Sequence, residues 1–441
     1  MRKLTTLFIA LLLLSEFTHA QEVLTLEKCM EIALDNNLQI KTAENNVLIA
    51  KSNRVQAIMQ FLPDLNAGID YSLRYGLGFD TSSGQLIDRI TRTSSPFLSS
   101  GWTVFGGFQN TYGLKGATFA QSSAEQNLEN TKLTTKNNVL TAYLNVILDK
   151  ERIRISEERI ELLSGQLERE KQRESVGVGD MEQVFNFQSQ LATEKLNLVT
   201  LNNALRSDKL QLLQIMTLAK VIDYKIEPED ISDADLLKPI QPYDQVLSNT
   251  ISYNPGLKSA TADYESARFG YKQSIAAMSP TVSIRAVWGT NYSNNFLDEN
   301  DMEVDWATQR IDNAYRRVSF SLNIPIFNQF RARNSMQVSR LNMRNAEISI
   351  EQAEQTILNT TQQVYLDLVT AQETYKAALE NLRALDQSFQ FVKTRYEAGR
   401  TDFYTYLESL NNKNRAEIEL VNAKYSIVFR QKIMNLLQGI K

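Results

Sequence analysis

The stretch Arg395-Tyr396-Glu397-Ala398-Gly399-Arg400-Thr401-Asp402-Phe403 interrupts a helical pattern that otherwise extends from about residue 330 to the C-terminus. A glycine that follows a long amphipathic pattern and precedes Thr-Asp predicts a helix end, a tight reversal and a second helix. A second stretch, Glu174-Ser175-Val176-Gly177-Val178-Gly179-Asp180-Met181, likewise places glycine and aspartate between two helical patterns. The chain is therefore expected to contain two helical hairpins, each with its own tip.

The glycine and the aspartate of each tip are expected to shape the turn. Gly177 and Gly399 should adopt the left-handed backbone conformation that ends a helix, because glycine does so without a steric penalty. Asp180 and Asp402 should cap the helices that follow, and Gln183 lies at capping-box spacing after Asp180.

Apolar side chains recur every seven residues in the long helical pattern before each tip. A strict seven-residue repeat predicts either the seam of a left-handed supercoil or the core of a helical bundle. No proline occurs between residues 108 and 175, so a helix over this range would be roughly 100 Å long. The repeating positions are Val146, Ile153, Ile160 and Leu167 before the first tip, and Leu368, Tyr375, Leu382, Phe389 and Tyr396 before the second.

The chain after about residue 20 repeats itself. Asn254 and Pro280 follow Asn37 and Pro63 at one spacing of 217 residues, and the two tip glycines are 222 residues apart. One unit used twice is the simplest reading. We predict a first repeat over 21–222, an irregular linker over 223–242 and a second repeat over 243–441. The first repeat should contain a helix, strands 64–75 and 97–106, helix 108–175, tip 175–180 and helix 181–218. The second should contain a helix, strands 281–291 and 317–327, helix 330–397, tip 397–402 and helix 403–438.

The predicted strands have one apolar and one polar face, because apolar and polar residues alternate along them, although strand 97–106 shows a weaker version of this pattern. Such a sheet fits a soluble sandwich, with its polar face in water, or a membrane barrel, with its apolar face in lipid. Strand length and aromatic positions favour the barrel. The aromatic residues at the expected girdles are Tyr71, Tyr75, Trp102, Trp288 and Tyr292.

Four strands cannot close a barrel, and open sheet edges are not tolerated in lipid. Several chains are therefore expected to share one barrel. The segments 76–95 and 292–316, rich in Ser, Asn, Asp and Thr, are interpreted as the longer loops at its outer surface.

The N-terminus resembles a secretory signal. A charged start, an apolar run from Leu7 to Leu14 and small residues near Ala20 predict cleavage after Ala20. His19, the only histidine of the sequence, would leave with this segment. Histidine-based acid–base catalysis and ordinary zinc sites are thereby excluded, and we expect neither an enzyme nor a cofactor or metal site.

Other features exclude further classes of protein. Cys29 is the single cysteine, so no intramolecular disulfide is possible, and its apolar neighbours indicate a buried residue and not a nucleophile. No run of about 18 apolar residues predicts a transmembrane helix. A net charge of −4 without a basic block argues against nucleic-acid binding.

Four features together resemble the TolC-like outer-membrane efflux proteins over nearly the whole mature chain: the opening from Leu24 to Asn37, the two repeats, the paired strands, and the segment Arg395 to Gly399. The resemblance implies a homotrimer in which four strands per chain form a twelve-stranded outer-membrane barrel, continued by an α-helical barrel across the periplasm. It also implies that the tips, with Gly177, Asp180, Gly399 and Asp402, dock to a periplasmic adaptor and an inner-membrane pump. The chain would then be a passive, gated exit duct of an efflux or type I secretion system.

The resemblance also indicates residues of a periplasmic gate. Tyr396 matches the family's tyrosine three residues before the glycine, and Glu408 matches one of two acidic positions on the next helix, whereas Thr405 occupies the other. The family's linking arginine is replaced by Thr401, with Arg400 one position earlier, and Gln183 stands in place of the partner acid. A ring of three Glu408 carboxylates would favour cations, although Glu408 could equally be a solvated helix residue.

Two other functions compete with the duct. A non-conducting adhesin or envelope-spacing coiled coil is disfavoured by the polar strand faces, because a filled barrel needs an apolar interior. An exported enzyme is disfavoured by the missing histidine and by the absence of a clustered acid pair. The exported cargo and the class of pump are not specified by the sequence.

Overall fold

A computed structural model describes residues 23–79, 84–218, 224–227, 236–300 and 302–440. The expected signal segment, residues 1–20, and part of the expected linker lie outside these ranges. The described chain divides into two compact units. The first comprises residues up to 45, 126–257 and 352–441, and the second comprises residues 46–125 and 258–351.

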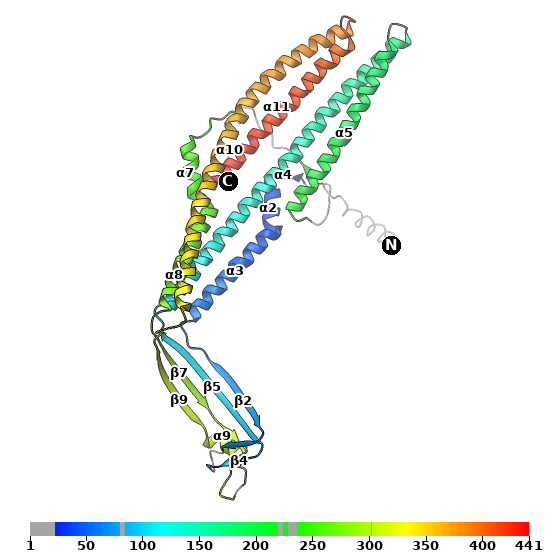
Figure 1. The fold of residues 1–441 in the computed structure, drawn as a ribbon. Helices are drawn as coiled ribbons and strands as arrows, with labels where there is room; N and C mark the ends of the chain where they lie inside the picture. The colour runs from blue at the N-terminus through cyan, green and yellow to red at the C-terminus, as the bar shows by residue number, and fades with distance from the viewer. Residues whose placement is uncertain (1–22, 80–83, 219–223, 228–235, 301, 441) are drawn as a thin grey trace, which may run out of the picture. The chain divides into compact units, whose positions relative to one another are not determined.

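The helices occur in pairs of equal length. Helices α4 (Gln109–Ser175) and α10 (Arg331–Glu397) have 67 residues each, and α5 (Met181–Ile215) and α11 (Phe403–Leu437) have 35 each. The shorter pairs are α2 (Leu26–Asn36) with α7 (Tyr243–Tyr253), and α3 (Leu38–Met59) with α8 (Pro255–Ala276). Figure 1 shows α4 and α5 forming one antiparallel hairpin and α10 and α11 the other.

The hairpin tips have the local geometry that the sequence predicts. Gly177 and Gly399 have φ angles of 78° and 68°. The N–H of Arg400 closes the end of α10 by donating to the carbonyl of Arg395 at 2.8 Å. Asp402 Oδ1 accepts from the Thr405 N–H at 2.9 Å, and Asp180 Oδ1 accepts from the Glu182 N–H at the same distance. Glycine therefore ends each long helix and aspartate starts the next.

The seven-residue pattern corresponds to buried positions. Leu368, Tyr375, Phe389 and Tyr396 are buried along α10, and Val146 and Leu167 are buried along α4. One buried cluster joins α2, α4 and α5, and a second joins α7, α10 and α11. The pattern thus marks the bundle core within the chain.

Cys29 lies in the first of these clusters and is fully buried. Burial, together with the nearby charge of Glu27, raises the pKa of its thiol to about 12. The thiol is thus neutral and packed, as the sequence indicates.

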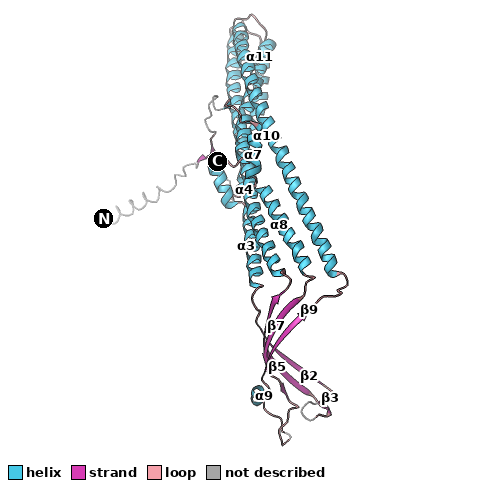
Figure 2. Cartoon of the chain, turned by 90° about the vertical axis from the view of Figure 1, so that its left-hand side faces the viewer, coloured by secondary structure: helices cyan, strands magenta, loops and turns pink. Residues whose placement is uncertain are grey.

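Four long strands form an antiparallel sheet in the second unit (Figure 2). Their order is β2 (Asn66–Arg74), β5 (Thr91–Phe105), β7 (Thr281–Gly289) and β9 (Tyr315–Asn323), so that β2 and β9 lie at the edges. The register aligns Ala67, Leu98, Trp288 and Arg316 in one row. Because side chains alternate between faces, this row shares the apolar face with Ile69, Ile284 and Phe320, and Asp70, Arg285 and Arg317 lie on the polar face.

The two segments interpreted as loops contain short elements that the sequence analysis missed. Strands β3 (Leu77–Phe79) and β4 (Leu86–Asp88) pair with each other, β8 (Tyr292–Ser293) pairs with β5, and Asp305 caps helix α9 (Trp306–Asp312). Strand β5 also begins at Thr91, earlier than the predicted residue 97. A parallel pair, β1 (Val23–Leu24) with β6 (Lys225–Ile226), was likewise not predicted. Strands this short carry no periodicity that a sequence pattern can reveal.

None of the helices formed by the described residues has an apolar stretch long enough to cross a membrane.

Replacing Gly399 with alanine should destabilise the second tip. The added Cβ meets no atom within 4 Å, but φ is +68°, which costs an L-residue about 1–2 kcal/mol. Gly165→Ala is the matched control, because that glycine lies inside α4, where alanine is favoured by about 1 kcal/mol and also has open space. Thermal unfolding of the purified protein should show opposite shifts for the two variants. Equal shifts of the unfolding temperature in the two variants would show that alanine is not strained at position 399.

Candidate functional site

The two hairpins meet in a buried aromatic cluster next to their tips. Phe187 of α5 packs edge-on against Phe403 of α11, with ring centroids 4.7 Å apart. Tyr396 of α10 and Tyr406 of α11 lie 4.9 Å apart beside it. We call these four residues the tip cluster. Leu163, Leu167, Val184, Leu191, Phe389 and Leu410 complete the surrounding apolar core, so both hairpins contribute to one core.

The hydroxyl of Tyr396 links the two hairpins directly. It donates a hydrogen bond to Gln183 Oε1 of α5 at 2.8 Å, and Glu170 Oε1 of α4 lies 3.2 Å from the same oxygen. Tyr396 and Glu170 are each only 3% exposed. A hydrogen bond to a charged, buried acceptor is among the stronger ones in proteins. We call Tyr396, Gln183 and Glu170 the tip link.

The tip link keeps its donor at physiological pH. Burial, followed by the negative charge of Glu170, raises the pKa of Tyr396 well above its ordinary value. Because the pKa is raised on folding, the associated stability is complete below about pH 10 and is lost as the pH rises through the folded-state value. Burial likewise raises the pKa of the neighbouring Tyr406 to about 12.

A weaker ion pair lies at the surface of the same region. Arg169 of α4 and Glu397 of α10 approach to 2.9 Å, and both side chains are substantially exposed. Exposed pairs contribute about 0–1 kcal/mol and are screened by salt. The tip link, and not this pair, is therefore the main polar connection at the tip.

A buried polar layer forms a second connection between the hairpins. Arg159 of α4 pairs with Glu194 of α5 at 3.2 Å and donates to Asn411 Oδ1 of α11 at 2.6 Å. Ser156 donates to Glu194 Oε1 at 2.7 Å. Breaking a buried ion pair by removing one partner is strongly destabilising, so this layer specifies how α11 packs on the first hairpin.

The structure separates the residues that the resemblance grouped as gate candidates. Tyr396 is buried in the tip link. Thr405 is occupied in capping, since its hydroxyl donates to Asp402 Oδ2 at 2.8 Å. Arg400 and Glu408 are exposed, and neither forms an ion pair within the described part of the chain. A single chain therefore does not bring Arg400 or Glu408 into the tip link.

Gln183 does not make the capping-box contact that its spacing suggests, and it lies instead in the tip link, at the position where the resemblance places the partner acid. The capping-box spacing predicts a contact back to the start of α5, but its side-chain oxygen accepts from Tyr396. Glu170, Phe187 and Tyr406 were not singled out from the sequence. Leu163 and Glu170 continue the helical face of the predicted core on α4, which is the one signal that could have indicated Glu170.

No metal centre is formed by the described residues, since nowhere among them do three His, Cys, Asp or Glu side chains gather. The site consists instead of a hydrophobic core with a few hydrogen bonds between the two hairpins.

Comparison with known proteins defines the class. The model of the family described as "Outer membrane efflux protein" matches residues 29–217 and 246–433, which is most of the chain and covers both halves. The chain belongs to this family. It is an outer-membrane channel of an efflux system and not an enzyme.

Individual relatives agree with this assignment. The chain is 22% identical to outer membrane protein TolC of Escherichia coli K12 over 98% of its own length and 85% of that protein. The solved structure of CusC superposes with a TM-score of 0.79 at 15% identity, covering 94% of this chain and 92% of that one. The structure of VceC from Vibrio cholerae gives a TM-score of 0.78 at 14% identity, covering 94% and 96%. The expected fold class is thereby confirmed.

Replacing Tyr396 with phenylalanine should loosen the tip without removing its ring packing. The change leaves Gln183 Oε1 without the Tyr396 donor and leaves the buried Glu170 carboxylate with Arg173, whose Nη1 lies 3.4 Å from Oε1. Loss of the buried hydroxyl donor costs about 1–3 kcal/mol. Hydrogen exchange in residues 163–191 and 396–410 should accelerate roughly tenfold or more, in line with that energy. Tyr404→Phe is the control, because Tyr404 is 68% exposed. Unchanged protection in the Tyr396 variant would exclude the tip link as a stabilising contact.

Proposed function

We propose that three copies of this chain form a gated, passive duct across the outer membrane and periplasm. The observation that carries the proposal is the sheet, which has an apolar face, a polar face and two unpaired edges, β2 and β9. Edges cannot remain open in lipid, and four strands are too few for a barrel. Twelve strands from three chains satisfy both requirements and leave the polar faces lining a water-filled lumen.

We also propose that the hairpin tips dock to a periplasmic adaptor, which connects the duct to an inner-membrane pump of a tripartite efflux or type I secretion system. The apolar residues Val176 and Val178 at the first tip are 72% and 69% exposed, which supports contact with a partner. Gly177, Asp180, Gly399 and Asp402 would act by fixing the shape of this surface, because both aspartates are occupied in capping.

The tip link is proposed to hold the periplasmic entrance closed. Separating Tyr396 from Gln183 and Glu170 would release the second hairpin from the first. Glu408 would then contribute a ring of three carboxylates to the entrance, and the exposed position of Glu408 on α11 supports this. Arg400 is also exposed and could pair only with a neighbouring chain or a partner.

The domain organisation is part of the proposal. Residues 1–20 would be removed as a signal peptide, and residues 21–222 and 243–441 would be two structural repeats joined by the linker 223–242. The equal lengths of the paired helices support the two repeats.

Replacing Glu408 with glutamine should weaken cation selectivity and block by multivalent cations, because it removes three carboxylates from the proposed ring. Single-channel recording in planar bilayers measures both, and the wild-type protein should show cation-selective openings. Glu419→Gln is the matched control, because Glu419 is an exposed acid of the same helix about three turns further from the tip. Unchanged cation selectivity in the Glu408 variant would show that this residue is not part of the gate. A wild-type protein without conductance would contradict the proposal that the chain forms a duct.

A further inference from the structure

An arginine that has no acidic partner among the described residues lies on the apolar face of the sheet. The register places Leu98, Trp288 and Arg316 side by side on β5, β7 and β9, with Ser100, Ala286 and Val318 in the next row of the same face. Arg316 is exposed, and within the described part of the chain no carboxylate forms an ion pair with it. Its neighbours on this face, Trp288, Ala286 and Val318, are apolar, so the charge has no counterpart among the described residues.

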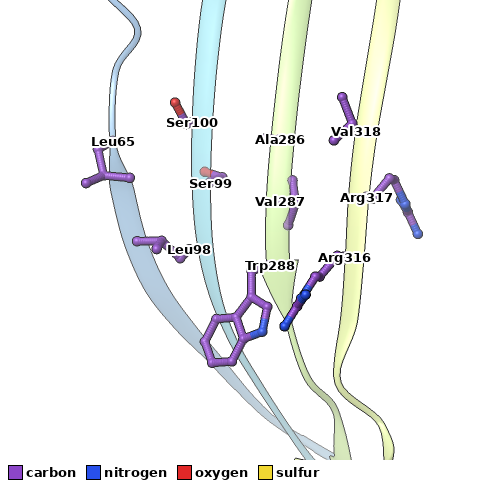
Figure 3. A pocket seen from close by; sticks show the side chains of 10 residues that line it. All are labelled: Leu65, Leu98, Ser99, Ser100, Ala286, Val287, Trp288, Arg316, Arg317 and Val318. Carbon is purple, nitrogen blue, oxygen red and sulfur yellow. The ribbon is translucent and has the colours of Figure 1, made fainter.

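A shallow depression of about 260 Å³ lies beside this arginine. Leu65, Leu98 and Val318 line its apolar part, and Trp288 and Arg316 lie close together at one end of it (Figure 3). These side chains remain exposed, with 39% of Leu98, 47% of Trp288 and 62% of Val318 accessible. The depression therefore combines an apolar surface with one fixed positive charge.

The membrane determines what can cover this surface. The apolar face of a sheet in an outer-membrane channel contacts lipid. Trp288 and Arg316 are one residue from the end of β7 and β9 that leads into the loop between these strands. This is the end opposite α8, and since the helices of such channels are periplasmic, it lies at the outer leaflet. A tryptophan at this depth belongs to the interfacial girdle.

The charge of Arg316 specifies the head group. An arginine facing lipid is tolerated near the interface, where its cost falls to about 0–1 kcal/mol, and not at the bilayer centre. Its planar guanidinium binds phosphate oxygens in a bidentate manner. A lipid phosphate at this level can reach the guanidinium while its acyl chain lies in the depression.

We propose that the depression beside Trp288 binds a phosphorylated lipid of the outer leaflet, with Arg316 holding the phosphate and Leu98, Trp288 and Val318 contacting the acyl chain. This binding site is independent of the gate at the hairpin tips. It gives each chain a specific lipid contact on the outer surface of the sheet.

The adjacent residue provides a matched control. Arg317 follows Arg316 on β9 and also borders the depression. The register places its side chain on the polar face, and Figure 3 shows it pointing away from Trp288. Its guanidinium lies 5.7 Å from the ring centroid of Tyr315. Substitution of either arginine removes the same charge from the same strand. Only Arg316 faces the lipid.

The test is lipid binding to the full mature chain purified in detergent, measured by native mass spectrometry. The probes are lipid A with two phosphates, lipid A without phosphates, and inorganic phosphate as competitor. Arg316→Gln should weaken binding of the phosphorylated lipid about tenfold or more, as expected for loss of a charge-assisted hydrogen bond. Arg317→Gln should change it less than twofold. The dephosphorylated lipid should bind weakly to all variants, and inorganic phosphate in excess should not displace the lipid.

Several results would overturn the proposal. Wild-type affinity in Arg316→Gln, or equal losses in the two arginine variants, would show that no specific site exists at Arg316. Displacement by inorganic phosphate would show an anion site that does not recognise lipid. The same spectra report whether each variant assembles. If Arg316→Gln fails to assemble, Arg316→Lys keeps the charge and should show an intermediate loss of lipid affinity. Full lipid affinity in Trp288→Leu would exclude the apolar half of the site.

Discussion

The backbone hydrogen bonds of the four-stranded sheet impose the constraint on which the rest of this protein depends. Every N–H and C=O group inside a bilayer must be paired, because no water is present to replace a missing partner. Within the described part of the chain, strands β5 and β7 are paired on both sides, but β2 and β9 each have one free edge. In the proposed assembly, copies of the chain supply the partners for these two edges. The alternation of apolar and polar residues, which decides which face meets lipid, has a function only in that assembly.

The two units of the chain are stabilised in different ways. The sheet is held by the backbone hydrogen bonds of its antiparallel ladders, which extend along the whole length of β2, β7 and β9. The hairpin tips are held by one aromatic cluster, the tip link and the polar layer around Arg159. A region held by few contacts can open locally at moderate free energy. This difference agrees with the proposal that the entrance at the tips opens while the sheet remains intact.

Local features of the structure could be predicted from the sequence, and contacts between distant segments could not. The roles of Gly399 and Asp402 could be predicted from the sequence, because a helix end and a helix cap depend on neighbouring residues alone. The seven-residue pattern predicts which side of α10 is buried, since it reflects one face of a helix. The tip link joins residues 213 positions apart, and Gln183 has a local pattern that indicates a cap and not this contact. The faces of Arg316 and Arg317 are set by strand register, where a shift of one residue exchanges them.

The number of chains in the assembly tests the central claim most directly. Native mass spectrometry of the protein, extracted from the membrane in mild detergent, counts the copies that close the edges of β2 and β9. We predict three copies of the mature chain, because three sheets of four long strands complete the barrel without an open edge. A stable monomer or dimer extracted from the membrane would contradict this account, since eight or fewer strands with a polar face cannot enclose the proposed duct.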